Sequence, residues 1–167
     1  YVLNGSTTFQ LKKPLKKAAK VVEFAHANGV SVEAEVGTIG GEEDGIIGDG
    51  ELAPIEDAKA MVATGIDFLA AGIGNIHGPY PENWSGLHLD HLQKLTEAVP
   101  NFPIVLHGGS GIPDDQIQAA IKLGVAKVNV NTECQIAFAN ATRKFVAEYE
   151  ANEAEYDKKK LFDPRNS

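Results

Sequence analysis

The sequence predicts an α/β fold with a parallel sheet, and three observations lead to that prediction. Short apolar runs alternate with amphipathic stretches along most of the 167 residues. Two of the runs, 66–72 and 102–106, show no polar alternation, which is typical of strands covered on both faces. The connections between the predicted strands and helices are short, and the alternation of the two implies parallel strands joined by right-handed crossovers. Either an open doubly wound sheet or part of a (β/α)8 barrel fits this pattern.

Local signals justify each element. Apolar residues at helical spacing predict the first helix, which Asn28 and Gly29 close, and Pro54 and Pro113 mark the starts of two others. Helices are expected over 15–28, 54–64, 89–98, 113–123 and 133–160, the last broken near Asn152. Strands are expected over 1–3, 30–36, 66–72, 102–106 and 126–130. The glycine- and acid-rich segment 37–51 has no periodicity and is expected to be a long loop.

Five predicted strands are too few for a closed barrel, which needs eight strands and roughly 250 residues. Both ends of the chain look cut, because Tyr1 opens inside a strand and 161–165 ends without a closing element. We therefore expect an incomplete (β/α)8 TIM barrel of about five βα units, the C-terminal part of a larger barrel. Residues 1–167 are expected to form a single domain.

Composition excludes several classes of function. The net charge of −8 argues against a nucleic-acid surface, which normally carries a basic patch. We find no basic-then-apolar leader and no apolar run near eighteen residues, so neither secretion nor a membrane span is expected. The single cysteine, Cys134, fits a reducing compartment and a cytoplasmic location.

Two histidines follow buried strands and are candidate metal ligands. His77 follows the predicted strand 66–72, and His107 follows the predicted strand 102–106 directly. Chemistry in α/β folds gathers at the carboxyl ends of strands, and neutral imidazole is a common metal ligand. The simpler interpretation is a pair of hydrogen-bonded structural histidines. A catalytic zinc usually takes three protein ligands, and this pair supplies two.

A rival cluster and a phosphate site complete the candidates around these histidines. His88 and His91 flank Asp90, but a helix follows directly, so a solvated helix start is the better interpretation.

Residues 107–111, His-Gly-Gly-Ser-Gly, open toward a predicted helix, and their backbone N–H groups can approach an anion closely. Residues 129–132 end the next strand at the same rim. Together they favour a phosphate site over structural turns.

Carboxylates mark a third feature. Glu33 and Glu35 lie on one face of a predicted buried strand, where carboxylates need a cation or a hydrogen-bond network. The acidic segment 40–45 is either a solvated surface loop or a lid that brings a carboxylate base over a substrate.

The chain resembles the class II (metal-dependent) fructose-bisphosphate aldolases over nearly its whole length. Four segments in the family's order carry this resemblance: 33–44, 74–78, 105–111 and 127–133. The tagatose-bisphosphate aldolases share this layout. The resemblance implies a lyase of glycolysis and gluconeogenesis that cleaves fructose 1,6-bisphosphate reversibly to dihydroxyacetone phosphate and glyceraldehyde 3-phosphate. It also implies a TIM barrel, a catalytic zinc, and a homodimer or homotetramer when full length.

The resemblance implies roles for individual residues. His77 and His107 would be two of three zinc ligands, Glu35 would hold a second divalent or monovalent cation, and Glu43 would be the catalytic base. Dihydroxyacetone phosphate would be held by Gly78, Gly108, Gly109, Ser110, Asn129, Val130, Asn131 and Thr132.

Two departures from the family pattern matter. The family's upstream zinc histidine and its neighbouring catalytic aspartate have no match here, and Asn4 stands where relatives commonly have an aspartate near the second cation. This chain alone is therefore expected to bind zinc weakly and to catalyse poorly. The alternatives are a tagatose-bisphosphate aldolase, a truncated non-catalytic barrel fragment, or another metal-dependent barrel enzyme acting on sugar phosphates.

Overall fold

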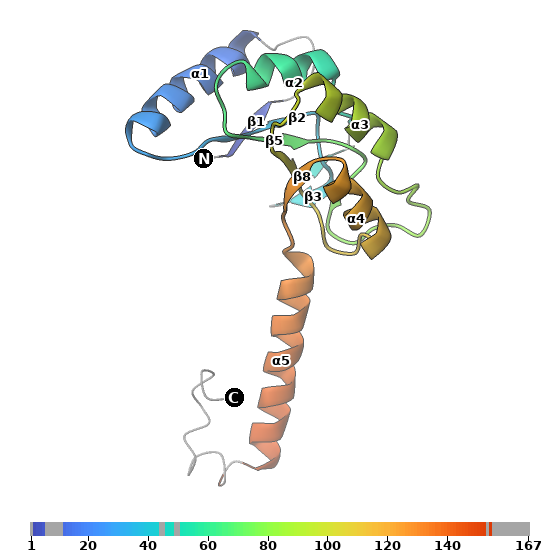
Figure 1. Cartoon of the computed structure of the whole chain (residues 1–167). Helices are drawn as coiled ribbons and strands as arrows, with labels where there is room; N and C mark the ends of the chain where they lie inside the picture. The colour runs from blue at the N-terminus through green and yellow to red at the C-terminus, as the bar shows by residue number, and fades with distance from the viewer. Residues whose placement is uncertain (1, 6–11, 44–45, 49–50, 153, 155–167) are drawn as a thin grey trace. The chain divides into compact units, whose positions relative to one another are not determined.

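The computed structural model describes residues 2–5, 12–43, 46–48, 51–152 and 154 (Figure 1). The chain divides into two compact units, Tyr1–Asn131 and Thr132–Ser167. The first unit contains a parallel sheet with its covering helices and a smaller sheet. The second unit contains helix α5 (Thr132–Ala151). The expectation of one domain over the whole chain stays a prediction.

The main sheet is parallel, and its strands follow one another in chain order, β1-β2-β5-β7-β8. Its strands are β1 (Val2–Gly5), β2 (Glu33–Val36), β5 (Phe68–Ala71), β7 (Ile104–Leu106) and β8 (Val125–Val128). A doubly wound sheet reverses its strand order at a switch point, whereas a (β/α)8 barrel adds each strand on the same side. The observed order therefore decides between the two architectures in favour of a barrel arc.

Four helices connect these strands: α1 (Lys12–Ala27), α2 (Ile55–Val62), α3 (Leu89–Ala98) and α4 (Asp114–Lys122). Helices α1, α2 and α3 lie over the same side of the sheet, and α2 packs on β2 and β5 (Figure 1). Pro54 and Pro113 occupy the N-cap positions of α2 and α4, so each helix begins one residue later than expected. Within the described residues, no helix is long and apolar enough to cross a membrane.

The hydrophobic core lies between the sheet and these helices. Alternate strand residues enter it, as the pleat of a strand requires; they are Ala34, Val36, Leu69, Ala71, Ile104 and Leu106. The opposite face of the sheet is also buried, at Ala70 and Val105, but there it carries the charged side chains of Glu33 and Glu35. The sheet is thus apolar toward the helices and polar at one point of its other face.

The expectation of a long irregular loop over 37–51 is wrong in part. Within this segment, strands β3 (Gly40–Glu43) and β4 (Ile46–Gly48) form an antiparallel pair. Strand β3 also pairs in parallel with β6 (Ile76–His77). These contacts are made by the backbone, so glycines and acidic residues can form them without an alternating side-chain pattern. As a result the acidic segment is hydrogen-bonded to the strand that contains His77.

Asp67 joins helix α1 to the entry of the sheet. Its Oδ2 accepts a hydrogen bond from the backbone N–H of Val32 (2.7 Å) and another from His26 Nε2 (2.9 Å). The hydrogen bond from His26, followed by that from Val32, lowers the pKa of the Asp67 carboxyl below its ordinary value. The folded state therefore favours the ionised carboxylate.

The Asp67→Asn variant tests this interaction. At pH 7 we expect its free energy of unfolding to fall by about 1 kcal/mol, the usual size of a lost hydrogen bond. A lowered folded-state pKa contributes stability above the unfolded value of about 3.9 and loses it as the pH falls through the folded value. Urea denaturation from pH 7 to pH 3 should therefore show the wild-type and variant stabilities converging in acid. A constant difference would contradict the assignment.

Candidate functional site

His77 and His107 converge at the carboxyl end of the main sheet. His107 directly follows β7, and His77 ends β6 in the smaller sheet. Their ring centroids lie 6.0 Å apart with the rings nearly perpendicular, at 81°. The prediction that two sequence-distant imidazoles meet at one point of the fold is confirmed, whereas their role as metal ligands stays a prediction.

Asn75 connects the segment that precedes His77 to the segment that contains His107. The side chain is 1% exposed; its Oδ1 accepts from the N–H of Ile73 (2.9 Å), and its Nδ2 donates to the His107 carbonyl (3.0 Å). A buried amide must find partners for both ends, and here the two ends tie the turn after β5 to the end of β7. A buried side chain therefore connects the His107 backbone to the segment that precedes His77.

Tyr80 makes a second bridge between the same segments. Its hydroxyl donates to the Gly108 carbonyl (2.7 Å) and accepts from the Ile76 N–H (3.2 Å). Burial raises the pKa of the Tyr80 phenol, and the bond from Ile76 opposes that rise only in part. The neutral hydroxyl can therefore act as donor and acceptor at once.

The glycines after His107 are required by packing. Gly108 has φ +63°, and a Cβ there would collide with the carbonyl oxygen of Ile76. Gly109 donates its N–H to the Asn129 carbonyl (2.9 Å), and a Cβ there would lie 2.6 Å from Val128 Cγ1. The loop therefore fits tightly between β6 and the end of β8. The Gly109 N–H is already committed within the fold.

Glu33 contacts His107 from the buried face of the sheet. Its Oε1 lies 2.8 Å from His107 Nε2, and its Oε2 accepts from Lys127 Nζ at 2.7 Å. The Glu33 side chain is 7% exposed and that of His107 is 11% exposed. Of the two partners predicted for a buried carboxylate on this strand, a cation or a hydrogen-bond network, Glu33 has the network.

The contacts of Glu33 with His107 and Lys127 also indicate that the main sheet is curved. Glu33 lies on β2 and Lys127 on β8, and the strand order places β5 and β7 between them. In a flat sheet three strand spacings would separate the two backbones by roughly 14 Å. A contact of 2.7 Å between the two side chains therefore indicates that the sheet curls toward this face, as a barrel arc does.

The electrostatics of Glu33 follow from the same contacts. Burial acts to raise the pKa of its carboxyl, but the hydrogen bonds from Lys127 and His107, together with the charge of Lys127, outweigh burial and lower the pKa. The carboxylate is therefore ionised at neutral pH and accepts hydrogen bonds at both oxygens.

The other predicted residues are placed as follows. Ser110 is buried in the loop after His107, and Asn129 donates its N–H to the Leu106 carbonyl (2.9 Å). Val130 and Asn131 are exposed at the same end of the sheet, and Thr132 begins the second unit. Gly78 lies directly after β6 and has φ +87° with open space beside it. The side chains of Glu43 and Asn4 lie outside the described part of the structure.

Glu35 is buried next to Glu33 on β2. Across the described residues, no group of three histidine, cysteine, aspartate or glutamate side chains is arranged to hold a metal ion. His88, Asp90 and His91, the alternative cluster of potential metal ligands, have a structural explanation. His91 Nε2 bonds the Ala53 carbonyl (2.7 Å), and Asp90 lies in the first turn of α3. His77 and His107 remain the candidate ligands.

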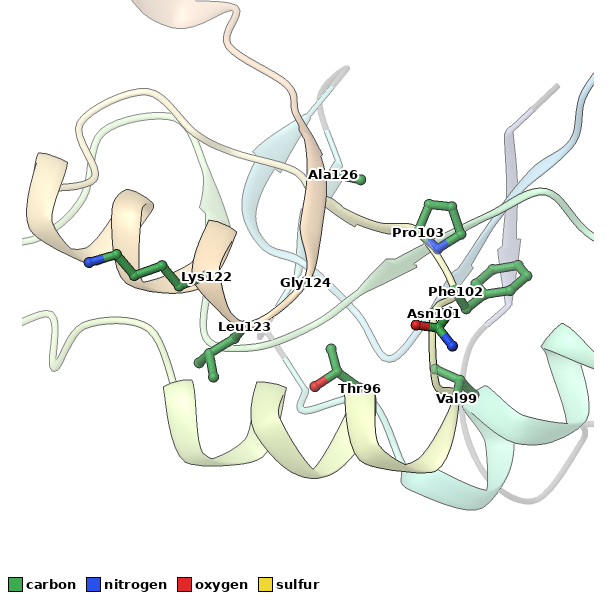
Figure 2. A pocket seen from close by; sticks show the side chains of 9 residues that line it. All are labelled: Thr96, Val99, Asn101, Phe102, Pro103, Lys122, Leu123, Gly124 and Ala126. Atoms are coloured by element: carbon green, nitrogen blue, oxygen red, sulfur yellow. The ribbon is translucent and has the colours of Figure 1, made fainter.

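A cavity of about 400 Å³ lies at the opposite end of β7 and β8 and is not the candidate site. Thr96, Val99 and Phe102 line it, together with Asn101, Pro103, Lys122, Leu123, Gly124 and Ala126 (Figure 2). Lys122 extends away from Thr96 of α3 and from the side chains of the segment between α3 and β7 (Figure 2). In barrels the amino ends of the strands serve stability rather than chemistry.

Comparison with known proteins agrees with this arrangement. The sequence model of the family described as fructose-bisphosphate aldolase class-II matches residues 2–167. A fructose-bisphosphate aldolase of Streptococcus pneumoniae serotype 4 is 86% identical over 155 residues, which make up 93% of this chain and 53% of that relative. A fructose-bisphosphate aldolase of Streptococcus pyogenes serotype M1 is 83% identical over 155 residues, again 93% of this chain and 53% of that relative. The crystal structure of the YdjI aldolase from Escherichia coli K12 is 33% identical with a TM-score of 0.68, covering 90% of this chain and 50% of that chain.

The chain belongs to the class II fructose-bisphosphate aldolase family. It spans about half the length of the curated relatives it matches. The predicted fold class, an incomplete (β/α)8 barrel of about five βα units, is confirmed by the parallel sheet and by the solved neighbours.

Sequence reasoning missed Lys127, Asn75 and Tyr80 as residues of the site. Asn75 and Lys127 fell inside noted segments, but no role was assigned to either. One signal could have found Lys127, because a lysine on one predicted strand and buried glutamates on another need partners of opposite charge. No comparable signal marked Tyr80, since its partners are backbone groups.

Two glycine variants separate backbone strain from collision. Gly29 and Gly108 have similar φ values, +69° and +63°, but nothing lies near a Cβ at Gly29. We expect Gly29→Ala to cost about 1 kcal/mol, because only its left-handed backbone is strained. Gly108→Ala should cost about 1–3 kcal/mol more, because the Ile76 carbonyl must also move. Urea denaturation of both variants measures the difference, and equal losses would show that the loop has room.

Proposed function

We propose that this chain supplies the zinc-binding and triose-phosphate-binding side of a class II aldolase. The whole protein would cleave fructose 1,6-bisphosphate reversibly to dihydroxyacetone phosphate and glyceraldehyde 3-phosphate in glycolysis and gluconeogenesis. The observation that supports this most is the convergence of His77 and His107, with centroids 6.0 Å apart, beside the glycine loop that follows β7. Family membership supports the choice of reaction.

The donor set fits a zinc ion in part. Imidazole nitrogen suits zinc, and the two rings converge from separate sheets. His107 Nε2 is taken by Glu33, so Nδ1 is the nitrogen left for a metal. The described residues offer these two ligands without a third. When bound, zinc supplies a Lewis acid that polarises the substrate ketone.

The remaining roles concern proton transfer and phosphate binding. Glu43 is proposed as the base that removes a proton from the ketose phosphate, and Glu35 as a ligand of a second cation. Backbone N–H groups and the Ser110 hydroxyl are proposed to hold the phosphate, with contributions from Gly78, Gly108, Asn129, Val130, Asn131 and Thr132. Because the Gly109 N–H already bonds Asn129, Gly109 would act through its lack of a side chain.

Two alternatives remain alongside this proposal. A tagatose-bisphosphate aldolase would use the same histidines and the same glycine loop. A truncated barrel without catalysis is favoured by one observation, the lack of a third metal-ligating side chain among the described residues. The proposal also includes a sugar phosphate as ligand, a homodimer or homotetramer for the whole protein, and a cytoplasmic location consistent with a single cysteine.

The test is a chimera in which this chain is joined to the part of the Streptococcus pneumoniae relative that the chain does not cover. We expect the chimera to cleave fructose 1,6-bisphosphate in a coupled assay, and to lose that activity when a chelator removes the metal. His107→Ala and His77→Ala should each lower turnover by at least about 100-fold, because each removes a zinc ligand.

The matched control is His26→Ala, which removes a histidine that bonds Asp67 away from the site. It should leave turnover unchanged. Chelator-resistant cleavage, or full turnover in His107→Ala, would contradict the zinc assignment. Faster cleavage of tagatose 1,6-bisphosphate would favour the first alternative. An inactive chimera that is nevertheless folded would favour the non-catalytic fragment.

A further inference from the structure

We propose that Glu33, held in place by Lys127, is a positioning residue that sets the ring orientation and the tautomer of His107, so that Nδ1 faces outward as a metal ligand. The proposal rests on the assignment of His107 as a zinc ligand. It assigns Glu33 and Lys127 a role that acts through His107.

The tautomer follows from hydrogen-bonding capacity. A carboxylate carries no hydrogen and can only accept, so the His107 nitrogen 2.8 Å from Glu33 Oε1 must be the one that carries its hydrogen. In a neutral imidazole the other nitrogen, Nδ1, then keeps the lone pair that a metal needs. Burial of both side chains removes water as a competing partner.

Lys127 restrains the carboxylate. Glu33 could turn about its terminal bond if one oxygen were unbound, but Lys127 Nζ holds Oε2 at 2.7 Å while His107 holds Oε1. The two donors come from neighbouring strands, His107 directly after β7 and Lys127 from β8. The carboxylate plane, and with it the direction of the His107 ring, is therefore defined by three elements together.

Other histidines in the chain show what a purely structural contact looks like. His91 bonds a backbone carbonyl, that of Ala53, and His26 pairs with Asp67 where both side chains are partly exposed. Of these three described contacts, only that of His107 involves a buried carboxylate whose second oxygen is also held. A carboxylate behind a ligating imidazole orients the ring and raises its basicity, and losing such a partner typically lowers metal affinity about 10–100-fold.

The experiment uses the chain labelled with ¹⁵N histidine and free of metal. Long-range proton–nitrogen correlation should identify His107 as the Nε2–H tautomer. In Glu33→Gln, Lys127 retains the amide oxygen and the amide NH₂ turns toward His107, so the tautomer should switch to Nδ1–H. Adding Lys127→Met frees the amide to rotate, and the Nε2–H form should return. This rescue by a second substitution would not arise from a merely structural role.

Zinc affinity gives the second readout, measured by competition with a chromophoric chelator. We expect Glu33→Gln to bind zinc about 10–100-fold more weakly than wild type, and the double variant to recover part of that loss. Asp67→Asn is the matched control, because it alters a carboxylate–histidine pair elsewhere in the fold. It should leave both the His107 signals and zinc affinity unchanged.

The outcomes separate this inference from the proposed function. If the chimera binds no zinc at His107, the proposed function fails, while the tautomer measurement still decides the role of Glu33. An unchanged tautomer in Glu33→Gln, or a double variant as impaired as the single one, would overturn the inference. If Glu33→Gln does not fold, Lys127→Met alone should keep the tautomer and weaken zinc binding several-fold, and unaltered affinity would overturn the part assigned to Lys127.

Discussion

The buried carboxylate of Glu33 is the constraint from which the arrangement of the site follows. A charge on the inner face of a parallel sheet is costly unless donors reach it, and here Lys127 and His107 each hold one oxygen. Because the two donors belong to strands on one side of β2, the contacts also require the sheet to curl. Curvature, ring orientation and charge neutralisation therefore arise from one cluster of side chains.

A second set of contacts brings the smaller sheet to the larger one. Asn75 and Tyr80 bond backbone groups on both sides of the junction, and Gly108 allows the chain to pass close beneath Ile76. Through β6 this junction positions His77, and through β3 it anchors the beginning of the acidic segment. The candidate metal site is thus shared between two sheets, and neither sheet alone would bring the two imidazoles together.

Much of this could be predicted from the sequence, because apolar runs and their polar ends follow simple periodic rules. The convergence of His77 and His107 followed from their places after parallel strands, and the need of Glu33 for a network followed from burial. Opposite charge could point to Lys127 as a partner for the buried glutamates, but that it reaches Glu33 follows only once strand order and curvature are known. The pairing of β3 with β6 was missed because backbone groups make it and no side-chain pattern accompanies it.

The central claim is that two imidazoles from different sheets bind one ion. A double-mutant cycle of zinc affinity, measured by calorimetry on wild type, His77→Ala, His107→Ala and the double variant, tests it most directly. If both rings hold the same ion, either single substitution should remove nearly as much affinity as the double one. Additive losses of zinc affinity would mean that the two rings bind separate ions, and unchanged affinity would mean that they bind none. Either result would contradict the account.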